Sequence, residues 1–287
     1  MKPRWPILWI DADNRLREMA LGIQAIEKER VIPLTIDVPL IEDRLRGLHS
    51  ATQTVGQKGF VTKGQPKQQP KGYLQFLDYM DAADALIKQH SIRTVVLDPV
   101  TRIEEHLARF LQYQTRKGTI EESGWGIYLS NWEEIFNELL AFKKLGCSVV
   151  ATFHDKDYYD ADTEKRLGTK PLIRGQIQSK VGSYFAEVWY TFQKKFDGRP
   201  KWHVRTKPDD FTACRTSKPL DEIEDSYLPA ILEKGGWKDD EPLTLMLFGP
   251  YGSGKTTLIL SLCDVEEEVT ECNTPAAGKD ATTLVTT

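Results

Sequence analysis

Nine consecutive residues near the C-terminal end of the sequence form a complete phosphate-binding motif. An apolar run, Leu243 to Phe248, leads into G-x-x-x-x-G-K-[ST], and this strand-loop-helix context is the one the motif requires. Its glycines let successive N–H groups point at one anion, and a helix N-terminus adds partial positive charge. Lys255 would reach the β- and γ-phosphates of a nucleoside triphosphate, and the Thr256 hydroxyl would bind Mg²⁺. The predicted phosphate-binding residues are Gly249, Pro250, Tyr251, Gly252, Ser253, Gly254, Lys255, Thr256 and Thr257.

Two apolar runs upstream of this motif end in aspartates. Residues 91–98 close on Asp98, a pattern typical of the carboxylate that holds the Mg²⁺ water shell across from the P-loop threonine. Residues 6–10 are followed by Asp11 and Asp13, at the point where open α/β sheets place their ligands. For these two residues a helix N-cap is an equally good interpretation, because aspartate favours that position.

A third apolar run, residues 148–153, is followed by His154. A polar side chain at this point could contact the γ-phosphate and report its hydrolysis to the following loop. Because a histidine at such a position is as often structural as catalytic, the residue type alone does not decide its role.

The ends of these runs can form one site only if the runs are neighbouring strands. Strands that alternate with helices predict an α/β fold with a mostly parallel sheet and the P-loop strand near its middle. Residues 181–192 and 201–207, with a turn at 198–200, predict an antiparallel hairpin at one edge. Helices are expected over residues 15–29, 73–89, 102–120, 132–145 (with its N-cap at Ser130 or Asn131 and its end at Gly146) and 258–263.

Four segments have compositions that argue against a packed core. Residues 47–72 contain a basic stretch rich in lysine and glutamine, which predicts a mobile loop. This loop could contact a phosphate backbone, although a solvated insertion without a partner accounts for it equally well. Residues 158–180 are polar with interspersed basic residues and are expected to contain a second mobile loop. Residues 220–242 are expected to connect to the P-loop strand, and residues 273–287 to be a disordered tail.

The overall composition excludes several classes of protein. With 287 residues, of which 40% are hydrophobic, the chain can fill the core of one large domain, expected over residues 1–272. A net charge of −4 requires any nucleic-acid contact to be local. The four cysteines have no C-x-x-C spacing, no apolar run reaches membrane-spanning length, and the N-terminus is unlike a signal peptide. These features predict a cytoplasmic protein without a membrane partner.

The residues that close the apolar runs resemble those of RecA-type P-loop ATPases along nearly the whole chain. Residues 8–13 resemble the strand that ends in the catalytic carboxylate, which implies that Asp13 orients the attacking water. Residues 95–98 resemble the Walker B strand. Residues 148–154 resemble the strand whose last polar residue senses the γ-phosphate, with His154 where that family usually has glutamine. The resemblance implies ATP and Mg²⁺ as cofactors and ATP hydrolysis as the activity.

Two further segments extend this resemblance. Residues 158–180 would fall at the DNA-binding loop of the family, which implies single-stranded DNA as a partner. Residues 203–207 resemble the strand whose basic residues reach the ATP of a neighbouring subunit. This implies trans-acting roles for Arg205 and Lys207 and a homo-oligomer in the form of a ring or filament.

The chain also resembles the phage-type branch of this superfamily, whose nucleotide-binding proteins are linked to single-strand annealing and recombination. It shares a tryptophan before the helix that leads into residues 148–154, and a Pro-Leu-Ile-Arg-Gly-Gln segment at residues 171–176. The resemblance implies a role in recombination, annealing or replication, and a location in the host cytoplasm if a phage encodes the chain.

The order of the segments departs from that of the family. The family runs from the P-loop to the carboxylate, Walker B and the sensor, whereas here the P-loop comes last. A circular permutation would explain this order, since permuted chains are tolerated when the natural termini lie close together. The alternative is a complete upstream domain followed by a truncated second one. That arrangement would leave a lone strand and helix unable to bury their apolar faces.

Three functions are compatible with these features. The first, which we expect, is a Mg²⁺-dependent ATPase that acts on single-stranded DNA. The second is a nucleotide-binding switch or assembly protein with little hydrolysis and no DNA partner, which the negative net charge favours. The third is a small-molecule kinase, for which the sequence lacks a compact Arg-x-x-x-Arg lid motif.

Overall fold

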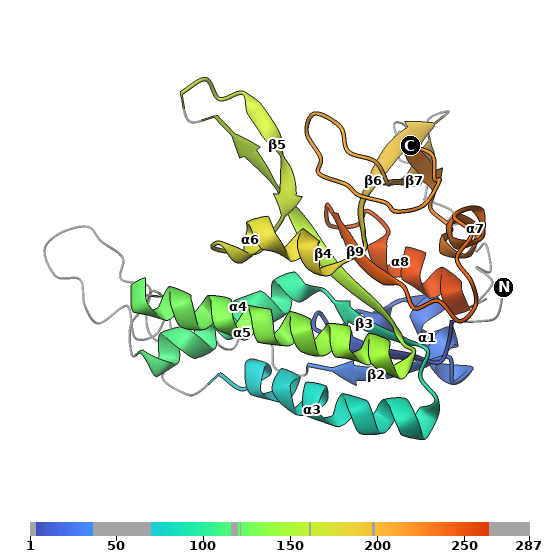
Figure 1. Cartoon of the computed structure of the whole chain (residues 1–287), viewed down its shortest axis with the longest axis horizontal. Coiled ribbons are helices and arrows are strands. Elements are labelled where there is room, and N and C mark those ends of the chain that lie inside the picture. The colour runs from blue at the N-terminus through green and yellow to red at the C-terminus, as the bar shows by residue number, and fades with distance from the viewer. Residues whose placement is uncertain are drawn as a thin grey trace, which may run out of the picture.

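The computed structural model describes residues 4–36, 70–115, 120, 122–160, 162–196 and 199–263. These residues form a nine-stranded sheet with helices on both faces (Figure 1). The strand order is β2-β1-β3-β4-β9-β6-β7-β8, and β5 pairs with β4 outside this path. The predicted α/β fold with a mostly parallel sheet is confirmed.

The parallel part of the sheet places the ends of its strands at one edge. It consists of β2 (Val31–Thr35), β1 (Ile7–Asp11), β3 (Thr94–Asp98), β4 (Ser148–Tyr159), β9 (Thr244–Gly249) and β6 (Glu187–Phe196). In this register Asp11 lies opposite Asp98, and His154 lies opposite Gly249. The P-loop strand β9 is near the middle, as predicted, because it pairs with both β4 and β6.

An antiparallel hairpin forms the edge beyond β6. Its second strand, β7 (Arg199–Arg205), pairs with β6 and then with the short strand β8 (Ile223–Asp225). The predicted edge hairpin is therefore confirmed, and β8 lies in the segment that was expected to be only a connector.

Two apolar layers hold the helices against the sheet. One face is covered by α3 (Gly72–His90), α4 (Val100–Gln114) and α5 (Glu122–Ala141), and the other by α1 (Ala20–Glu27), α7 (Leu228–Lys234) and α8 (Lys255–Leu260). Successive side chains of a strand point to opposite faces, so Leu8 and Ile10 enter the first layer and Ile7 and Trp9 the second. Burial on both faces explains why these strands are continuous apolar runs.

The helix expected over residues 132–145 begins ten residues earlier, at Glu122. Trp125, Tyr128, Trp132 and Phe136 follow one another at helical spacing and contact each other ring to ring. Ser130 and Asn131 were therefore wrong as N-caps. Asn131 lies inside the helix, where its side-chain oxygen accepts a hydrogen bond of 2.9 Å from the Tyr73 hydroxyl.

The segment 158–180, which was expected to contain a mobile loop, has more regular structure than its composition predicts. Strand β4 continues to Tyr159 and pairs with β5 (Arg166–Pro171), forming an arm that projects from the sheet (Figure 1). The short helix α6 (Ile177–Lys180) follows this arm. Backbone pairing with a preceding strand orders a segment whose composition by itself is that of a loop.

Three other expectations about segments have mixed outcomes. The helix over residues 15–29 is divided into a 3-10 turn, Leu16–Glu18, and α1. The connector over residues 220–242 contains β8 and α7. Most of the basic segment 47–72 and the whole tail 273–287 lie outside the described residues. Among the helices of the described ranges, none is both long and apolar enough to cross a membrane.

Candidate nucleotide site

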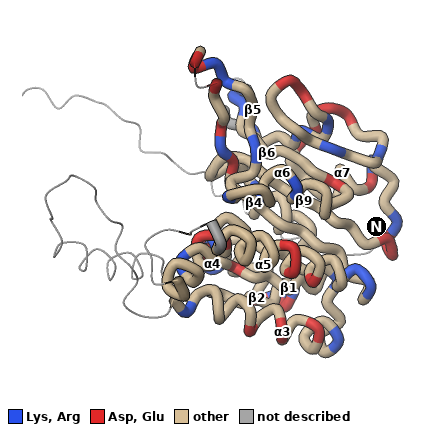
Figure 2. The backbone as a smooth tube through the Cα atoms, turned by 60° about the vertical axis from the view of Figure 1, so that its left-hand side comes forward, with Lys and Arg blue, Asp and Glu red and all other residues tan. Residues whose placement is uncertain are grey.

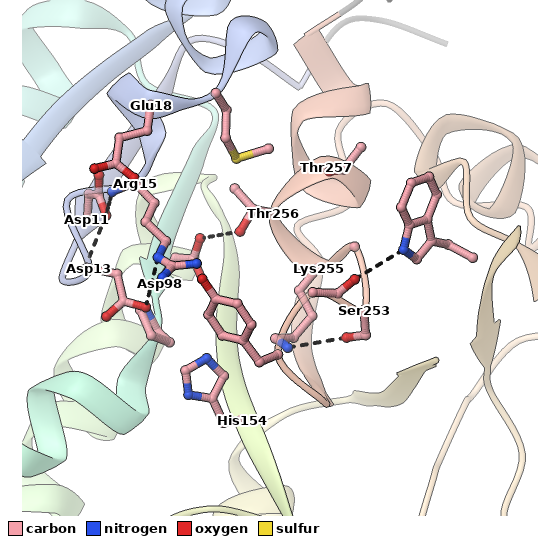
Figure 3. Close-up of a pocket in the computed structure, with 16 residues that line it drawn as sticks. Asp11, Asp13, Arg15, Glu18, Asp98, His154, Ser253, Lys255, Thr256 and Thr257 are labelled. Carbon is pink, nitrogen blue, oxygen red and sulfur yellow. Dashed lines mark hydrogen bonds and ion pairs between the residues drawn. The ribbon is translucent and has the colours of Figure 1, made fainter. Parts of the chain in front are cut away.

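A cavity of about 340 Å³ opens where the parallel strands end (Figure 3). Its lining comes from segments far apart in the sequence: the regions after β1 and β3, strand β4, the P-loop and β7. Asp13, Asp98, His154 and Lys255 all line this cavity, so the structure brings the four predicted catalytic residues together. Open α/β sheets bind their ligands at this edge.

Close packing against β6 shapes the P-loop. A Cβ atom on Gly249 would lie 2.2 Å from the carbonyl oxygen of Thr191, so only glycine fits there. The hydroxyl oxygens of Thr191 and Ser253 lie 2.7 Å apart and tie the loop to the same strand. Gly254 has a φ of 84°, a conformation that favours glycine, and it precedes the first turn of α8. The loop is thus held by the neighbouring strand as well as by its own turns.

The ammonium group of Lys255 lies inside the loop. Its Nζ donates hydrogen bonds to the carbonyl oxygens of Gly249 and Pro250, both at 2.8 Å, and contacts the Ser253 hydroxyl at 3.3 Å. Burial lowers the pKa of Lys255 to about 8, although the nearby carboxylates of Asp98, Asp155 and Asp13 act in the opposite direction. A phosphate that enters the loop would meet a positive charge with little water around it.

Asp98 and Thr256 meet directly although 158 residues separate them. The Thr256 hydroxyl donates to Asp98 Oδ2 at 2.9 Å, and the Thr152 hydroxyl of β4 donates to Asp98 Oδ1. Burial raises the pKa of Asp98 to about 6, while these hydrogen bonds lower it. The pair presents a hydroxyl and a carboxylate side by side. This donor set fits Mg²⁺, which is usually held by one or two protein oxygens together with substrate phosphates and water.

The two aspartates that follow β1 have different surroundings. Asp11 is buried and accepts hydrogen bonds from the backbone N–H groups of Leu16 at 2.9 Å and of Asp13 and Arg15 at 3.3 Å. These three bonds hold the turn that follows β1, and burial raises the pKa of Asp11. Asp13 instead forms an ion pair of 2.6 Å with Arg102 of α4. Asp11 is therefore not a helix N-cap, because the 3-10 turn that follows has Arg15 at its N-cap, and both aspartates line the cavity.

His154 lies next to an aromatic side chain of the P-loop. Its ring centroid is 5.8 Å from that of Tyr251, and the guanidinium carbon of Arg15 lies 4.2 Å from the centre of the Tyr251 ring on the same side of the site. Burial and the charge of Lys255 lower the pKa of His154, so the imidazole is neutral at pH 7. A neutral imidazole keeps one N–H group, and this group can donate a hydrogen bond to a phosphate oxygen.

Arg205 and Lys207 do not line this cavity. Arg205 forms ion pairs with Glu222 and, at 3.4 Å, with Asp209. Lys207 follows the end of β7. The predicted contacts of Arg205 and Lys207 with the ATP of a neighbouring subunit stay predictions.

Sequence reasoning missed several residues of the site. Arg15, Arg102, Thr152 and Trp202 belong to no motif, and each reaches the site through a contact between distant segments. Thr152 alone had a usable signal, because it is two residues before His154 in a strand and therefore faces the same side.

Comparison with known proteins adds one finding. A family model described as an AAA domain matches residues 57–216, which is more than half of the chain. The matched range includes β3, β4 and the β6–β7 hairpin and ends before the P-loop strand. No curated protein and no solved structure gives a match.

Proposed function

The chain belongs to the AAA domain family of P-loop ATPases, and on this premise we propose that it hydrolyses ATP with Mg²⁺ and couples hydrolysis to single-stranded DNA. The observation that carries the ATPase proposal is the 2.9 Å contact between Thr256 and Asp98. It joins the P-loop to the strand-end carboxylate in the arrangement that a metal-bound triphosphate requires.

In this proposal some residues of the cavity bind the nucleotide and its metal, and others take part in the hydrolysis. Lys255 binds the β- and γ-phosphates, and Thr256 and Asp98 hold the metal with its water shell. Bound Mg²⁺ would neutralise charge that develops on the phosphate oxygens. Asp13 orients the attacking water and accepts its proton, and the ion pair with Arg102 fixes the direction of that carboxylate. His154 contacts the γ-phosphate from β4.

The exchange of Asp13 for asparagine tests this division. Asp13→Asn should leave Mg²⁺-ATP binding within about twofold of the unchanged protein and lower turnover by about 10²–10⁴-fold, the usual contribution of a general base. Calorimetry measures the binding and phosphate release measures the turnover. Asp78→Asn, the same change at an exposed position of α3, is the matched control. Undiminished hydrolysis in Asp13→Asn would remove Asp13 from the mechanism.

The arrangement of the sheet supports a circular permutation. The P-loop strand enters between β4 and β6 and runs parallel to both, as a strand of the same sheet. The two ends of the described chain are also close together. Arg30 donates to the carbonyl oxygen of Cys263 and its guanidinium carbon lies 4.9 Å from the ring centre of Trp5. In a chain that began at the P-loop strand, a short connection could therefore join the region of Cys263 to the region of Trp5.

The arm formed by β4 and β5 supports the DNA part of the proposal. Lys156 and Lys170 are register partners on this arm, and their ammonium groups lie 5.9 and 5.1 Å from the ring centre of Tyr158. Among the described residues neither lysine forms an ion pair, whereas Arg166 of the same arm is paired with Asp157. Aromatic rings flanked by cations suit the bases and phosphates of a single strand.

Three acidic residues of the arm, Asp155, Asp157 and Asp160, bond to other protein groups. Figure 2 shows blue and red segments along the arm, so its charge is mixed. Asp155 accepts a hydrogen bond of 3.1 Å from Tyr190, and Asp160 accepts from the backbone of Asp162 and Thr163 in the tip. The face that carries Lys156 and Lys170 is therefore the one on which we place the strand.

A charge-removal experiment tests this placement. Lys156→Gln together with Lys170→Gln should weaken binding of a fluorescent single-stranded oligonucleotide and reduce the slope of log K against log salt by about 1.4, at roughly 0.7 per lost phosphate contact. Lys143→Gln together with Lys144→Gln removes the same charge from an exposed turn of another region and is the control. Equal effects of the two double variants would mean that only net charge matters.

A nucleotide-dependent switch without a DNA partner is the second candidate. The close pairing of Asp13 with Arg102 favours it, because the carboxylate oxygen that Arg102 holds is not free to bind a water molecule. In that case ATP would bind with little turnover, and the unchanged protein would show no salt-dependent binding of single-stranded DNA with or without ATP. In either case a homo-oligomer remains part of our proposal, with Arg205 and Lys207 directed at the nucleotide of a neighbouring subunit.

A further inference from the structure

Trp202 reaches the nucleotide cavity from the edge hairpin. Its Nε1 donates a hydrogen bond of 3.2 Å to the carbonyl oxygen of Gly252, and a Cβ atom on Gly254 would lie 3.1 Å from its Cδ1 and Cγ atoms. The side chain nevertheless remains 40% exposed and lines the cavity together with the P-loop. It is therefore a large aromatic surface that is held in place but not buried in the core.

Trp202 and the acidic residues approach the P-loop from opposite sides. In the sheet, β1 and β3 lie on the β4 side of the P-loop strand, whereas β7 lies on the β6 side. Thr256 faces the first side, where it bonds Asp98. A triphosphate with its metal-bound end near Asp98 must therefore extend its nucleoside away from the carboxylates. In that direction the nucleoside would lie beside the hairpin that carries Trp202.

The chemistry of Trp202 suits a base rather than a phosphate. Its single N–H group is engaged by Gly252, so the surface left to a ligand is apolar and aromatic. The other aromatic ring of the cavity, Tyr251, is less suitable because it lies between Arg15 and His154 on the acidic side.

We infer that Trp202 is the surface on which the nucleotide base stacks, and that this surface does not distinguish adenine from guanine. The inference rests on the proposed nucleotide site. An indole without an available hydrogen-bonding group can contact a base only through its π-face, and every base has one. Specificity for one purine would require a polar group, which Trp202 does not supply.

Binding of three ligands tests this inference: Mg²⁺ with ATP, with GTP, and with inorganic tripolyphosphate, which has no base. Trp202→Ala should lower the affinity for ATP and GTP by about 5- to 100-fold, the range that base stacking on an aromatic side chain supports. It should change the affinity for tripolyphosphate by less than about twofold, because the phosphate contacts remain. Trp202→Phe should recover most of the loss. Trp125→Ala removes a tryptophan that is 38% exposed on α5, outside the cavity, and should change none of the three affinities.

The outcomes that overturn the inference are distinct from failure of the proposed function. An equal loss for tripolyphosphate and ATP would show that Trp202 only shapes the P-loop. A preference for ATP over GTP that is lost in Trp202→Ala would contradict stacking without discrimination. If the unchanged protein bound neither ATP nor tripolyphosphate, the proposed nucleotide site itself would be wrong. If the unchanged protein bound tripolyphosphate and Trp202→Ala bound ATP as tightly as the unchanged protein does, only the stacking role of Trp202 would be wrong.

Discussion

Lys255 and Asp98 have pKa values moved toward each other by the same physical cause. Burial disfavours the charged form of each, so the lysine is lowered to about 8 and the aspartate is raised to about 6. Both groups must be charged to bind a metal-triphosphate complex, the lysine against phosphate and the carboxylate against the metal. In the free protein, Lys255 and Asp98 are both mostly charged only between about pH 6 and pH 8.

Nucleotide affinity should therefore depend on pH in a bell-shaped manner. Between pH 8 and 9 the charged fraction of Lys255 falls from about one half to about one tenth, and the affinity should fall by about fivefold. Below pH 6 the protonation of Asp98 should weaken binding that depends on Mg²⁺. Calorimetric titration with ATP at saturating Mg²⁺, repeated between pH 5.5 and 9, measures both limbs.

The two limbs can be separated by one variant. Asp98→Asn cannot titrate, so it should bind more weakly at pH 7 and lose the acidic limb while the alkaline limb stays. An affinity that is constant between pH 6 and 9 in the unchanged protein would contradict the assignment of these pKa values to binding.

At the scale of elements, the turn after β1 depends on one buried carboxylate. Asp11 accepts hydrogen bonds from three backbone N–H groups, and that of Leu16 is buried with it. These bonds position both the 3-10 turn that follows and Asp13. The same turn carries Arg15, which lies over Tyr251 of the P-loop.

Loss of this carboxylate should destabilise the fold. Asp11→Ala should reduce the free energy of unfolding by about 1–3 kcal/mol, the usual effect of leaving a buried N–H group without an acceptor. Urea denaturation followed by tryptophan fluorescence measures this change, and Asp78→Ala on the exposed face of α3 serves as the control. If Asp11→Ala kept its stability but lost Mg²⁺-dependent binding, Asp11 would be a metal ligand rather than a support of this turn.

The elements differ in how far local patterns determine them. Strands β1, β3 and β9 were predicted with the residues that end them, because a strand buried on both faces has a continuous apolar sequence. The buried part of β4 was predicted for the same reason, but the strand continues past His154 to Tyr159. The start of α5 was missed because serine and asparagine at 130 and 131 have the composition of a cap. Within the helix Asn131 instead contacts Tyr73, and aromatic rings of residues before and after it contact each other. The β4–β5 arm was missed because its pairing, not its composition, makes it a strand.

At the scale of the whole molecule, the final segments of the described chain complete a sheet that the first segments begin. Strand β9 is hydrogen-bonded on both sides, to β4 and to β6, and α8 packs in the same apolar layer as α1. Cys263, at the end of the described chain, lies against Arg30, which stacks on Trp5 near its beginning. We therefore expect that the chain could begin and end at another loop and still form the same sheet.

A rearranged chain should keep this architecture. Residues 240–263 placed first, joined by a short glycine-serine linker to residues 4–239, should fold and bind ATP with an affinity within about threefold of the unchanged protein, because exposed loops tolerate new termini. The new break falls between Asp239 and Asp240, which are both exposed. Circular dichroism and ATP calorimetry provide the measurements.

Deletion of the same segment supplies the contrast. A chain that ends at residue 242 should not fold, because the edges of β4 and β6 would lose their shared partner in the middle of the sheet. A stable, soluble product of that length would favour an independent upstream domain, and with it the alternative to circular permutation.

The sequence by itself determined which residues could bind a triphosphate, a metal and a water, because glycine, lysine and aspartate at strand ends have local signatures. It also determined the α/β class through the alternation of apolar runs with helices. The tertiary structure alone decided which of these residues meet. Whether Thr256 contacts Asp98, whether Asp13 is paired with Arg102, and whether Trp202 reaches the P-loop depend on the order of strands in the sheet. That order is a long-range property, set by how distant apolar faces pack, and no short stretch of sequence contains it.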